Sequence, residues 1–278
     1  MATGGKSGRK VLITGGTSGL GLELARKLLA AGYEVWVTGR TLKYSDRAGE
    51  GFHFLKTDFA DLRNVSCVLS EVLETGLRFD VVISNAGVLG PPSFIETRDG
   101  FEYTFQVNYL AHLLVSELVA YYADERTNIL FISVTSPVYK LVNPVFRMPE
   151  KSKYRSFRTY SESKYYLLLV TSSVCSDYPE KKLSGFSFDP GIFNSGIYRT
   201  QAKWFHGLYR FASPILRDPG KVATRLMGIL FNDKILDGAI YKNVNSYSLL
   251  TSNNRRAEEV FLSESKKSIR PYLPPSKL

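Results

Sequence analysis

The chain is 278 residues long, and its 44% hydrophobic and 13% aromatic content suffices for one large buried core. It contains no run of about 18 apolar residues, which argues against a membrane-spanning helix. The first apolar run, residues 11–13, is interrupted by Thr14-Gly15-Gly16 before a signal-peptide core forms. We therefore expect an unprocessed intracellular protein of the cytoplasm.

The net charge of +10 comes from scattered Lys and Arg residues, with short clusters at 6–10, 151–158 and 266–270. No nucleic-acid-reading motif accompanies them, so we expect no nucleic-acid partner. A basic surface also attracts anionic lipid headgroups, which leaves a weak membrane-surface contact open. Cys67 and Cys175 are too few for a disulfide framework and lack neighbours at metal-ligand spacing, so no metal is expected.

Short apolar runs alternate along the chain with segments of helical apolar spacing. The apolar runs predict strands at residues 10–14, 33–38, 80–84, 128–133 and 182–189. The spaced segments predict helices at residues 20–29, 65–73, 101–122 and 159–176. This alternation predicts an α/β fold with one doubly wound parallel sheet and helices on both faces. We expect one domain over 1–278 with its core at 10–250, and a loosely ordered tail at 263–278.

A glycine cluster, Thr14–Gly21 (TGGTSGLG), lies where the first predicted strand turns into the first predicted helix. Glycines let the backbone approach a pyrophosphate closely, and the positive end of the helix dipole favours the negative charge. The motif therefore predicts a nucleotide-phosphate site. The residues assigned to it are Gly15, Thr17, Ser18, Gly19, Leu20 and Gly21.

Tyr160 and Lys164 are four residues apart at the start of a predicted helix. Residues at this spacing share a helix face, so the phenol and the ammonium group are expected to point into one site. The lysine charge favours the phenolate and brings the tyrosine pKa from about 10 toward neutrality. The pair is therefore suited to general acid-base catalysis.

Together the two motifs resemble those of the short-chain dehydrogenase/reductase family, which has a Rossmann-type fold, and the resemblance extends from about Lys10 to Val244. Residues 99–118 and 238–241 are most similar to its subgroup of retinol dehydrogenases and protochlorophyllide reductases. Further matches follow in the family's order. They are Asp58-Phe59 beside the adenine, Asn85-Ala86-Gly87 against the cofactor, Asn108 in the following helix, and Pro190-Gly191 and Ser195 near the nicotinamide carboxamide.

The resemblance implies that hydride passes between the nicotinamide and a carbonyl or carbinol carbon while Tyr160 donates or removes the proton on oxygen. Lys164 would lower the tyrosine pKa and hold the nicotinamide ribose, and Asn108 would position a relay water. The family also implies a homodimer or homotetramer.

One position departs from the family pattern. The family ends its fifth strand with a serine that hydrogen-bonds the substrate oxygen, and in the simplest register Val134 stands there. Valine cannot donate that bond, so we expect Ser133 or Ser136 to take the catalytic role, with Thr135 as a further option. A second function stays open on this ground, in which the protein binds NADP as a sensor or scaffold with little or no catalysis.

Cofactor preference depends on the residues after the second strand, where a carboxylate would bind the ribose 2′-hydroxyl of NAD and an arginine the 2′-phosphate of NADP. The chain has Thr38-Gly39-Arg40 and no acidic residue until Asp46. This predicts that NADP(H) is preferred over NAD(H). If Arg40 instead stacks on the adenine or faces solvent, the preference is undecided.

The family uses residues 193–218 as a lid over the substrate, and in this chain the segment is rich in aromatic and aliphatic residues. We expect a small hydrophobic carbonyl or alcohol substrate. The same side chains would also suit packing on the core or on another subunit. His53, His112 and His206 have no partner spacing and are expected to be non-catalytic.

Overall fold

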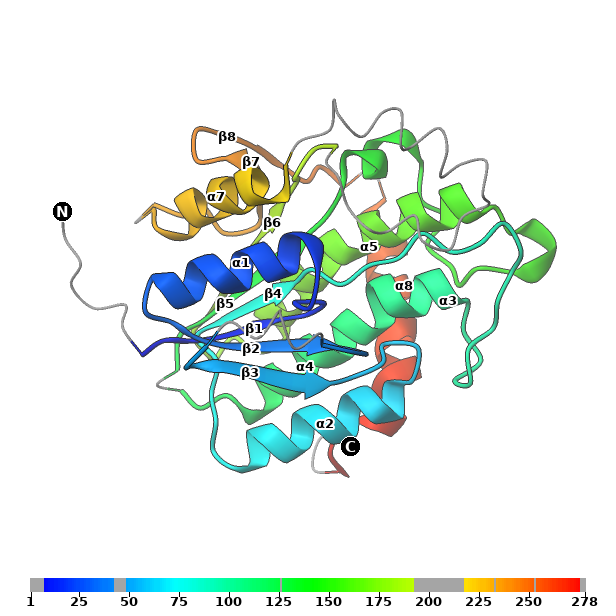
Figure 1. The fold of residues 1–278 in the computed structure, drawn as a ribbon. Coiled ribbons are helices and arrows are strands. Elements are labelled where there is room, and N and C mark those ends of the chain that lie inside the picture. Colours follow the sequence, from blue (N-terminus) through cyan, green and yellow to red (C-terminus); the bar gives the residue numbers. More distant parts are fainter. Residues whose placement is uncertain are drawn as a thin grey trace.

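A computed structural model of the protein describes residues 8–42, 49–125, 127–192, 218–232, 234–252 and 254–275 (Figure 1). Its strands form one sheet in the order β3-β2-β1-β4-β5-β6-β7-β8. Neighbouring strands are parallel except β8, which runs antiparallel to β7. The strands are β1 (Lys10–Ile13), β2 (Glu34–Gly39), β3 (Phe52–Lys56), β4 (Val81–Ser84), β5 (Ile129–Val134), β6 (Leu183–Phe188), β7 (Ala239–Asn243) and β8 (Ser246–Leu249).

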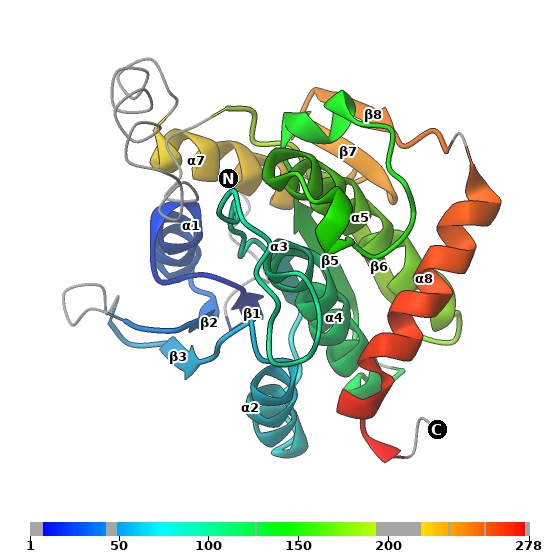
Figure 2. The same ribbon diagram turned by 90° about the vertical axis from the view of Figure 1, so that its right-hand side faces the viewer.

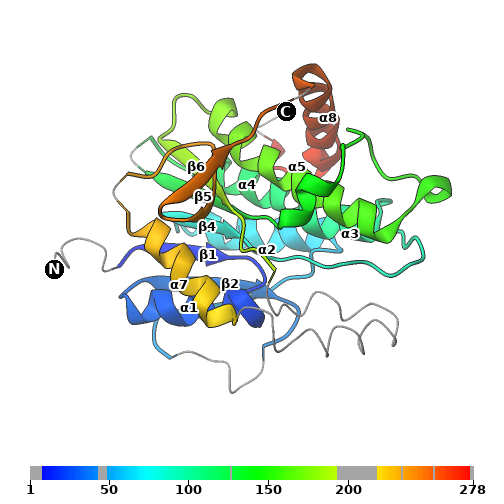
Figure 3. The same cartoon turned by 90° about the horizontal axis from the view of Figure 1, so that it is seen from above.

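Helices cover both faces of the sheet, as Figures 2 and 3 show. One face carries α1 (Gly19–Ala30) and α7 (Pro219–Leu230). The other carries α2 (Leu62–Glu74), α4 (Ala111–Tyr122), α5 (Ser156–Asp177) and α8 (Arg255–Ile269). Short helical turns complete the chain: α3 (Tyr103–Phe105), η2 (Gln106–Leu110), η3 (Pro137–Leu141), η4 (Lys151–Lys153) and η7 (Arg270–Tyr272).

Alternation along the strands divides the core into two layers because successive side chains of a strand point to opposite faces. On β5, Phe131 belongs to the cluster beneath α4 and α5, whereas Ile132 and Val134 belong to the cluster beneath α1 and α7. Both layers consist of buried aliphatic and aromatic side chains. The doubly wound α/β fold predicted from the sequence is confirmed.

The strand order reverses at β1, which pairs with β2 on one side and β4 on the other. In open α/β sheets, ligands bind outside the carboxyl ends of the strands at such a switch point. The segments that follow β1, β4 and β5 begin there with Thr14, Asn85 and Thr135. The chain connections therefore bring together motifs that are far apart in the sequence.

The predicted strands 10–14, 33–38, 80–84, 128–133 and 182–189 correspond to β1, β2, β4, β5 and β6. β3 was not predicted, because its sequence FHFLK lies at the sheet edge with no fully buried residue. The predicted helix 101–122 is also not a single α-helix. A π-helical turn, η2, separates α3 from α4 and contains Asn108.

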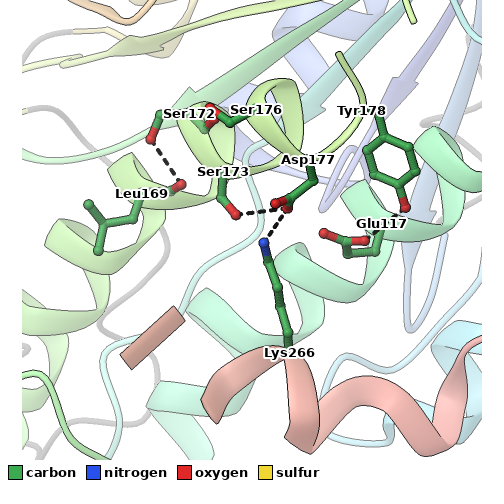
Figure 4. Close-up of polar contacts among 8 residues, drawn as sticks. All are labelled: Glu117, Leu169, Ser172, Ser173, Ser176, Asp177, Tyr178 and Lys266. Carbon is green, nitrogen blue, oxygen red and sulfur yellow. Dashed lines mark hydrogen bonds and ion pairs between the residues drawn. The ribbon is translucent and has the colours of Figure 1, made fainter. Parts of the chain in front are cut away.

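The tail differs from the expectation, because residues 263–272 are helical rather than loosely ordered. Phe261 and Ile269 of α8 are buried against α4 and α5, and the amphipathic pattern of α8 supplies this packing. Lys266 of α8 pairs with Asp177 at the end of α5, and Ser173 donates to the same carboxylate over 3.2 Å (Figure 4).

The segment expected to form the substrate lid, 193–218, lies outside the described residues except for Asp218, which caps α7. Within the described ranges, no helix combines the length and apolar character needed to cross a bilayer.

Candidate active site

In the turn from β1 to α1, the backbone lies close to the segment after β4 and to the first turns of α1. Gly15 has a φ of +65°, and a Cβ there would lie 2.9 Å from the Cα of Ala86. A Cβ at Gly21 would lie 2.5 Å from the Gly15 carbonyl oxygen. A side chain at either position would meet backbone, so packing requires both glycines, and the left-handed φ of Gly15 requires glycine there by conformation as well. The result is a cradle of the kind that a pyrophosphate needs.

The first turn of α1 is open to an anion. Ser18 is the N-cap residue, its side chain makes no capping hydrogen bond, and the turn contains no acidic residue. Ser18 and Gly19 are exposed, Thr17 is half-buried against Gly39, and Leu20 is buried in the core. The helix dipole and the unpaired N–H groups of such a turn favour a phosphate. The residues present therefore fit the phosphates of a dinucleotide.

Thr14 and Asn85 fasten the glycine turn to the end of β4. The Thr14 hydroxyl oxygen accepts from the backbone N–H of Asn85 over 2.8 Å and of Ala86 over 3.0 Å. The Asn85 side-chain amide donates to the carbonyl of Thr14 over 2.9 Å and of Gly15 over 3.3 Å. These bonds hold the Asn85-Ala86-Gly87 motif directly beside the cradle.

Asn108 links three segments from within the π-helical turn. Its amide exchanges two hydrogen bonds with the backbone of Val88, of 2.7 and 2.8 Å, and donates to the Ser163 hydroxyl over 3.0 Å. The Ser163 hydroxyl in turn donates to the Tyr160 carbonyl over 2.7 Å. Asn108 is fully buried. π-helical turns are frequent at functional sites, and this one aligns Asn108 with the turn of α5 that contains Tyr160.

Lys164 is almost fully buried, and its ammonium group donates to the Val134 carbonyl over 3.1 Å. The Thr135 hydroxyl donates to the Lys164 carbonyl over 2.9 Å, so the end of β5 and α5 are tied in both directions. Burial lowers the pKa of Lys164 from 10.5 to about 8. A Cβ at Gly87 would lie only 3.2 Å from the ammonium nitrogen, which brings the Asn85-Ala86-Gly87 motif against the lysine.

Tyr160 lies one turn before Lys164 on α5, and 5% of its surface is exposed. Asn108, Tyr160 and Lys164, predicted from separate stretches of sequence, are thus brought to one edge of the sheet. Ser163, which the sequence did not single out, and Thr135, named there only as a further catalytic option, join them as positioning residues. The contacts that give them this role, from Asn108 to Ser163 and from Thr135 to Lys164, join residues distant in sequence.

The two candidate serines near the end of β5 have different surroundings. Ser133 is buried, and its hydroxyl lies 2.6 Å from the Thr171 hydroxyl inside the α5 layer. Ser136 caps η3, is half-buried, and its hydroxyl has no hydrogen-bond partner among the described residues. Val134 contributes its carbonyl to Lys164 and its side chain to the opposite core layer. The Ser133 hydroxyl is thus occupied within the core, whereas the Ser136 hydroxyl makes no capping hydrogen bond.

The turn after β6 carries Pro190 and Gly191. The Asp189 carboxylate accepts from the Gly191 N–H over 2.9 Å, and Arg225 donates to the Pro190 carbonyl over 3.1 Å. Gly191 has a φ of +72°, which a residue with a side chain rarely adopts. The turn is held from both sides. Ser195, the predicted residue beyond it, lies outside the described residues.

A groove of about 720 Å³ opens beside the ends of β2 and β3, and it contains Arg40 and Asp58. Lys56 and Arg98 line it as well, so three exposed cations share this groove with the carboxylates of Asp58, Asp61 and Glu96. Strand register explains Lys56, which lies opposite Gly39 in the β2–β3 pair. Asp58 accepts from the Ala60 N–H over 3.0 Å, and Phe59 is buried behind it. Asp46 lies outside the described residues.

His112 is fully buried, and its Nε2 lies 2.9 Å from the Ala86 carbonyl oxygen. Burial lowers its pKa to about 3, so the imidazole is neutral at physiological pH. The His53 ring stacks on Trp36, with centroids 4.2 Å apart. His206 lies outside the described residues. In the part of the chain that the structure describes, no group of three or more His, Cys, Asp or Glu residues could hold a metal ion.

A second groove, of about 820 Å³, lies between α5 and α8 and includes Ser172, Ser173 and Lys266. Its serines donate to α5 itself, to the Leu169 carbonyl and to Asp177 (Figure 4). It is more than one turn beyond Lys164 along α5 and contains none of the predicted site residues. The predicted catalytic and cofactor-binding residues that the structure describes lie instead at the carboxyl ends of the strands, away from this groove.

Comparison with known proteins agrees with this geometry. The model of a family described as short chain dehydrogenase matches residues 9–205. The WW domain-containing oxidoreductase of Drosophila melanogaster is 30% identical over 220 residues, which cover 72% of this chain and 53% of that protein. Mouse retinol dehydrogenase 14 is 32% identical over 214 residues, covering 69% and 62%. The chain thus spans between about half and three fifths of the length of these relatives.

Among solved structures, a short chain dehydrogenase from Leptospira borgpetersenii with bound NAD+ superimposes with a TM-score of 0.59 at 17% sequence identity. The superposition covers 81% of this chain and 86% of the other. At this identity the likeness concerns the fold.

Proposed function

The chain belongs to the short-chain dehydrogenase/reductase family, in its retinol dehydrogenase-like subgroup, and from this premise we propose that it is an NADP(H)-dependent oxidoreductase acting on a hydrophobic carbonyl or alcohol. The family consists of oxidoreductases that bind a nicotinamide dinucleotide. The observation that carries the proposal is the joining of Asn108, Tyr160 and Lys164 at the switch point, directly beside the glycine cradle.

Glycines 15 and 21 and the open first turn of α1 would hold the phosphates, and Asn85-Ala86-Gly87 would line the path from the cradle to Lys164. When bound, the nicotinamide supplies or accepts the hydride. Tyr160 donates a proton to the substrate oxygen during reduction and removes it during oxidation. Lys164 favours the tyrosinate by its positive charge, and Asn108 fixes the turn of α5 that carries both groups.

Ser136 completes this arrangement in our proposal by donating a hydrogen bond to the substrate oxygen. Two observations support it over Ser133: the Ser133 hydroxyl is already paired with Thr171 in the core, and Ser136 is half-buried at the start of η3. A donor aimed at developing charge on oxygen strengthens in the transition state and so lowers the barrier.

The preference for NADP(H) is supported by Arg40, which lies in the groove beside β2 and β3 together with two further cations, Lys56 and Arg98, and three carboxylates, Asp58, Asp61 and Glu96. A 2′-phosphate carries a negative charge that the 2′-hydroxyl of NAD lacks, and Arg40 follows β2 where the acidic residue of NAD-binding proteins would stand. Charge-assisted hydrogen bonds to phosphate are the stronger kind, so even exposed cations discriminate between the two nucleotides.

A hydrophobic substrate is supported by exposed apolar side chains around the site. Phe157, one turn before Tyr160, is 53% exposed, and Ile192, just after Pro190-Gly191, is 67% exposed.

Family members commonly form oligomers, and for this chain we propose a homodimer or homotetramer in the cytoplasm. Light scattering of the purified protein and fractionation of the cells that produce it test those two points.

The alternative function is a nucleotide-binding sensor without turnover. One observation favours it, namely that Val134, which takes the place of the family's catalytic serine in the simplest register, turns its side chain into the core. The retained set of Asn108, Tyr160 and Lys164 weighs against it, because a binding module has no need of acid-base groups.

The deciding experiment is a titration with NADPH and NADH, followed by the absorbance of the reduced nicotinamide with a panel of apolar ketones and aldehydes. Tight NADPH binding with oxidation by any carbonyl supports the reductase. Tight binding without turnover across the panel supports the sensor, and binding of neither nucleotide contradicts both.

A further inference from the structure

The segment between η3 and the start of α5 exposes apolar side chains among basic ones. Leu141 is 68% exposed, Val145 38% and Phe157 53%, and Val260 of the neighbouring α8 is 53% exposed. Residues 137–158 hold six Lys or Arg and one Glu, a net charge of +5, which is half of the +10 of the whole chain. We call the exposed side chains of residues 140–158, together with Arg256 and Val260, the basic-apolar surface.

The parts of this surface are fixed to one another. Arg158 at the start of α5 donates to the Asn143 carbonyl over 3.4 Å, which ties the loop to the helix that carries Phe157. Val145 lines a groove of about 440 Å³ together with Arg256 and Val260 of α8. Figure 2 shows the loop after η3 beside the amino-terminal half of α8.

Phe146 anchors the loop from beneath. Its φ of +41° is unusual for a residue with a side chain, and its ring packs in the aromatic cluster of Tyr165, Tyr166 and Phe261, with centroid distances of 5.9 to 6.2 Å. The strained conformation is held by this packing. Because Phe146 points into the core, its neighbours Val145 and Arg147 are left on the outside, 38% and 49% exposed.

The charges on this surface are only partly neutralised within it. Glu150 pairs with Lys153 over 3.0 Å and with Arg147 over 3.5 Å, and all three side chains are largely exposed. Arg158 pairs with Glu162. Lys140 and Lys151 are exposed and form no ion pair with a described residue. Exposed apolar side chains bordered by cations match the boundary between anionic headgroups and acyl chains. Burial of the apolar side chains and attraction of the cations to the headgroups would each contribute to the binding free energy.

We propose that the basic-apolar surface docks the protein on anionic lipid bilayers. Leu141, Val145, Phe157 and Val260 enter the headgroup region, while the surrounding Lys and Arg side chains contact lipid phosphates. Ser136 immediately precedes η3, and Tyr160 lies one turn after Phe157, so docking would turn the proposed catalytic face toward the bilayer. The binding itself does not depend on the proposed function; only this orientation does.

The test is flotation of the full chain with vesicles of pure phosphatidylcholine and with vesicles that contain phosphatidylserine as well. The charge variant is Lys140→Glu/Lys151→Glu. Its matched control, Lys182→Glu/Lys234→Glu, makes the same charge change at the opposite edge of the sheet, just before β6 and β7. The apolar variant is Leu141→Ser/Phe157→Ser, and its control is Leu236→Ser/Leu249→Ser, which removes exposed leucines at the amino end of β7 and beside it.

We expect flotation with the anionic vesicles alone, an affinity loss of about 30-fold or more in the charge variant, and a smaller change in its control. The apolar variant should also bind less tightly than its own control. No flotation, equal flotation with both vesicle types, or equal losses in variant and control would overturn the proposal. Binding to heparin or a nucleic acid without binding to vesicles would overturn it too, and would assign the cations to another polyanion.

Discussion

The proton-handling region around Tyr160 and the nucleotide groove around Arg40 lie at the same edge of the sheet, but they are held in different ways. Asn108 and Lys164 are buried, and their side chains are hydrogen-bonded: Asn108 to the Val88 backbone and the Ser163 hydroxyl, Lys164 to the Val134 carbonyl. Arg40 and Lys56 are exposed and line an open groove. Packing and hydrogen bonds thus fix the positions of the proposed catalytic side chains. The side chains proposed to select the nucleotide are solvent-exposed and would act through their charge.

This difference has a consequence for substitutions. A change in the buried region disturbs hydrogen bonds that also stabilise the fold, because unpaired buried polar groups cost free energy. A change in the groove removes one charge and little else, since exposed cations have few structural partners. Catalysis and nucleotide preference should therefore respond separately to mutation.

The largest expected effect is that of Tyr160→Phe. Removing the phenolic hydroxyl removes the general acid and base, so kcat should fall about 100- to 10,000-fold. The dissociation constant of NADPH should stay within about twofold, since the cradle residues are untouched. Steady-state kinetics and a fluorescence titration measure both quantities.

Tyr165→Phe on the same helix is the matched control for that variant. Its hydroxyl donates to Glu258 of α8 over 2.8 Å, away from the proposed site. It should lower the free energy of unfolding by about 1 kcal/mol while activity is retained. Undiminished turnover in Tyr160→Phe would remove the tyrosine from the mechanism.

In the groove, Arg40→Ala should raise the dissociation constant of NADPH by about 10- to 100-fold, because it loses a charge-assisted hydrogen bond to the 2′-phosphate. NADH serves as the internal control and should change by no more than about twofold, since it has no phosphate there. Lys56→Ala should act in the same direction with a smaller effect. If Arg40→Ala weakens both nucleotides equally, Arg40 does not recognise the 2′-phosphate.

The two serines near the end of β5 should respond differently to substitution, because Ser133 is paired in the core and Ser136 begins η3. Ser136→Ala should lower kcat with little change in stability. Ser133→Ala should lower the free energy of unfolding by about 1 to 2 kcal/mol, because the Thr171 hydroxyl loses its buried partner, and should affect turnover less than Ser136→Ala does. Urea denaturation and kinetics on both variants separate the two roles, and a reversed ranking of their kcat values would reassign the donor to Ser133.

The smallest effect is a pH dependence from Lys164, whose pKa burial lowers to about 8. Above pH 8 the free protein loses the charge that favours the Tyr160 phenolate, so kcat/KM should decline with rising pH. Lys164→Met has no charge to lose, and its residual kcat/KM should lack this decline. A decline of equal size in Lys164→Met would exclude Lys164 as its origin.

The difference in the free energy of unfolding between the wild type and Lys164→Met should also depend on pH. The folded-state pKa lies below the value of 10.5 for an exposed lysine, so between about pH 8 and 10.5 the unfolded chain binds the proton and the folded chain does not. The wild type should therefore gain stability relative to Lys164→Met as pH rises through this window. Below pH 8 the full cost of the buried charge is present in the wild type.

Local patterns predicted much of this molecule. The glycine turn and the Tyr160–Lys164 spacing depend on a few neighbouring residues, so both are visible in the sequence. The pairing of Ser133 with Thr171, 38 residues apart, and the entry of Lys56 into the Arg40 groove depend on sheet register and helix packing. Such contacts leave no periodic signal. The amphipathic pattern of α8 is present in the sequence, but the surface that it covers forms only when α4 and α5 pack together.

The fate of the hydride would show whether this protein is an oxidoreductase. With NADPH deuterated at the transferring carbon and an apolar ketone substrate, we expect one deuterium on the carbinol carbon of the alcohol product. Mass spectrometry should show this label with the wild type, and product should form at least about 100-fold more slowly with Tyr160→Phe. Alcohol product without the label, or no product from any carbonyl despite tight NADPH binding, would contradict the assignment of this chain as a Tyr160-dependent oxidoreductase.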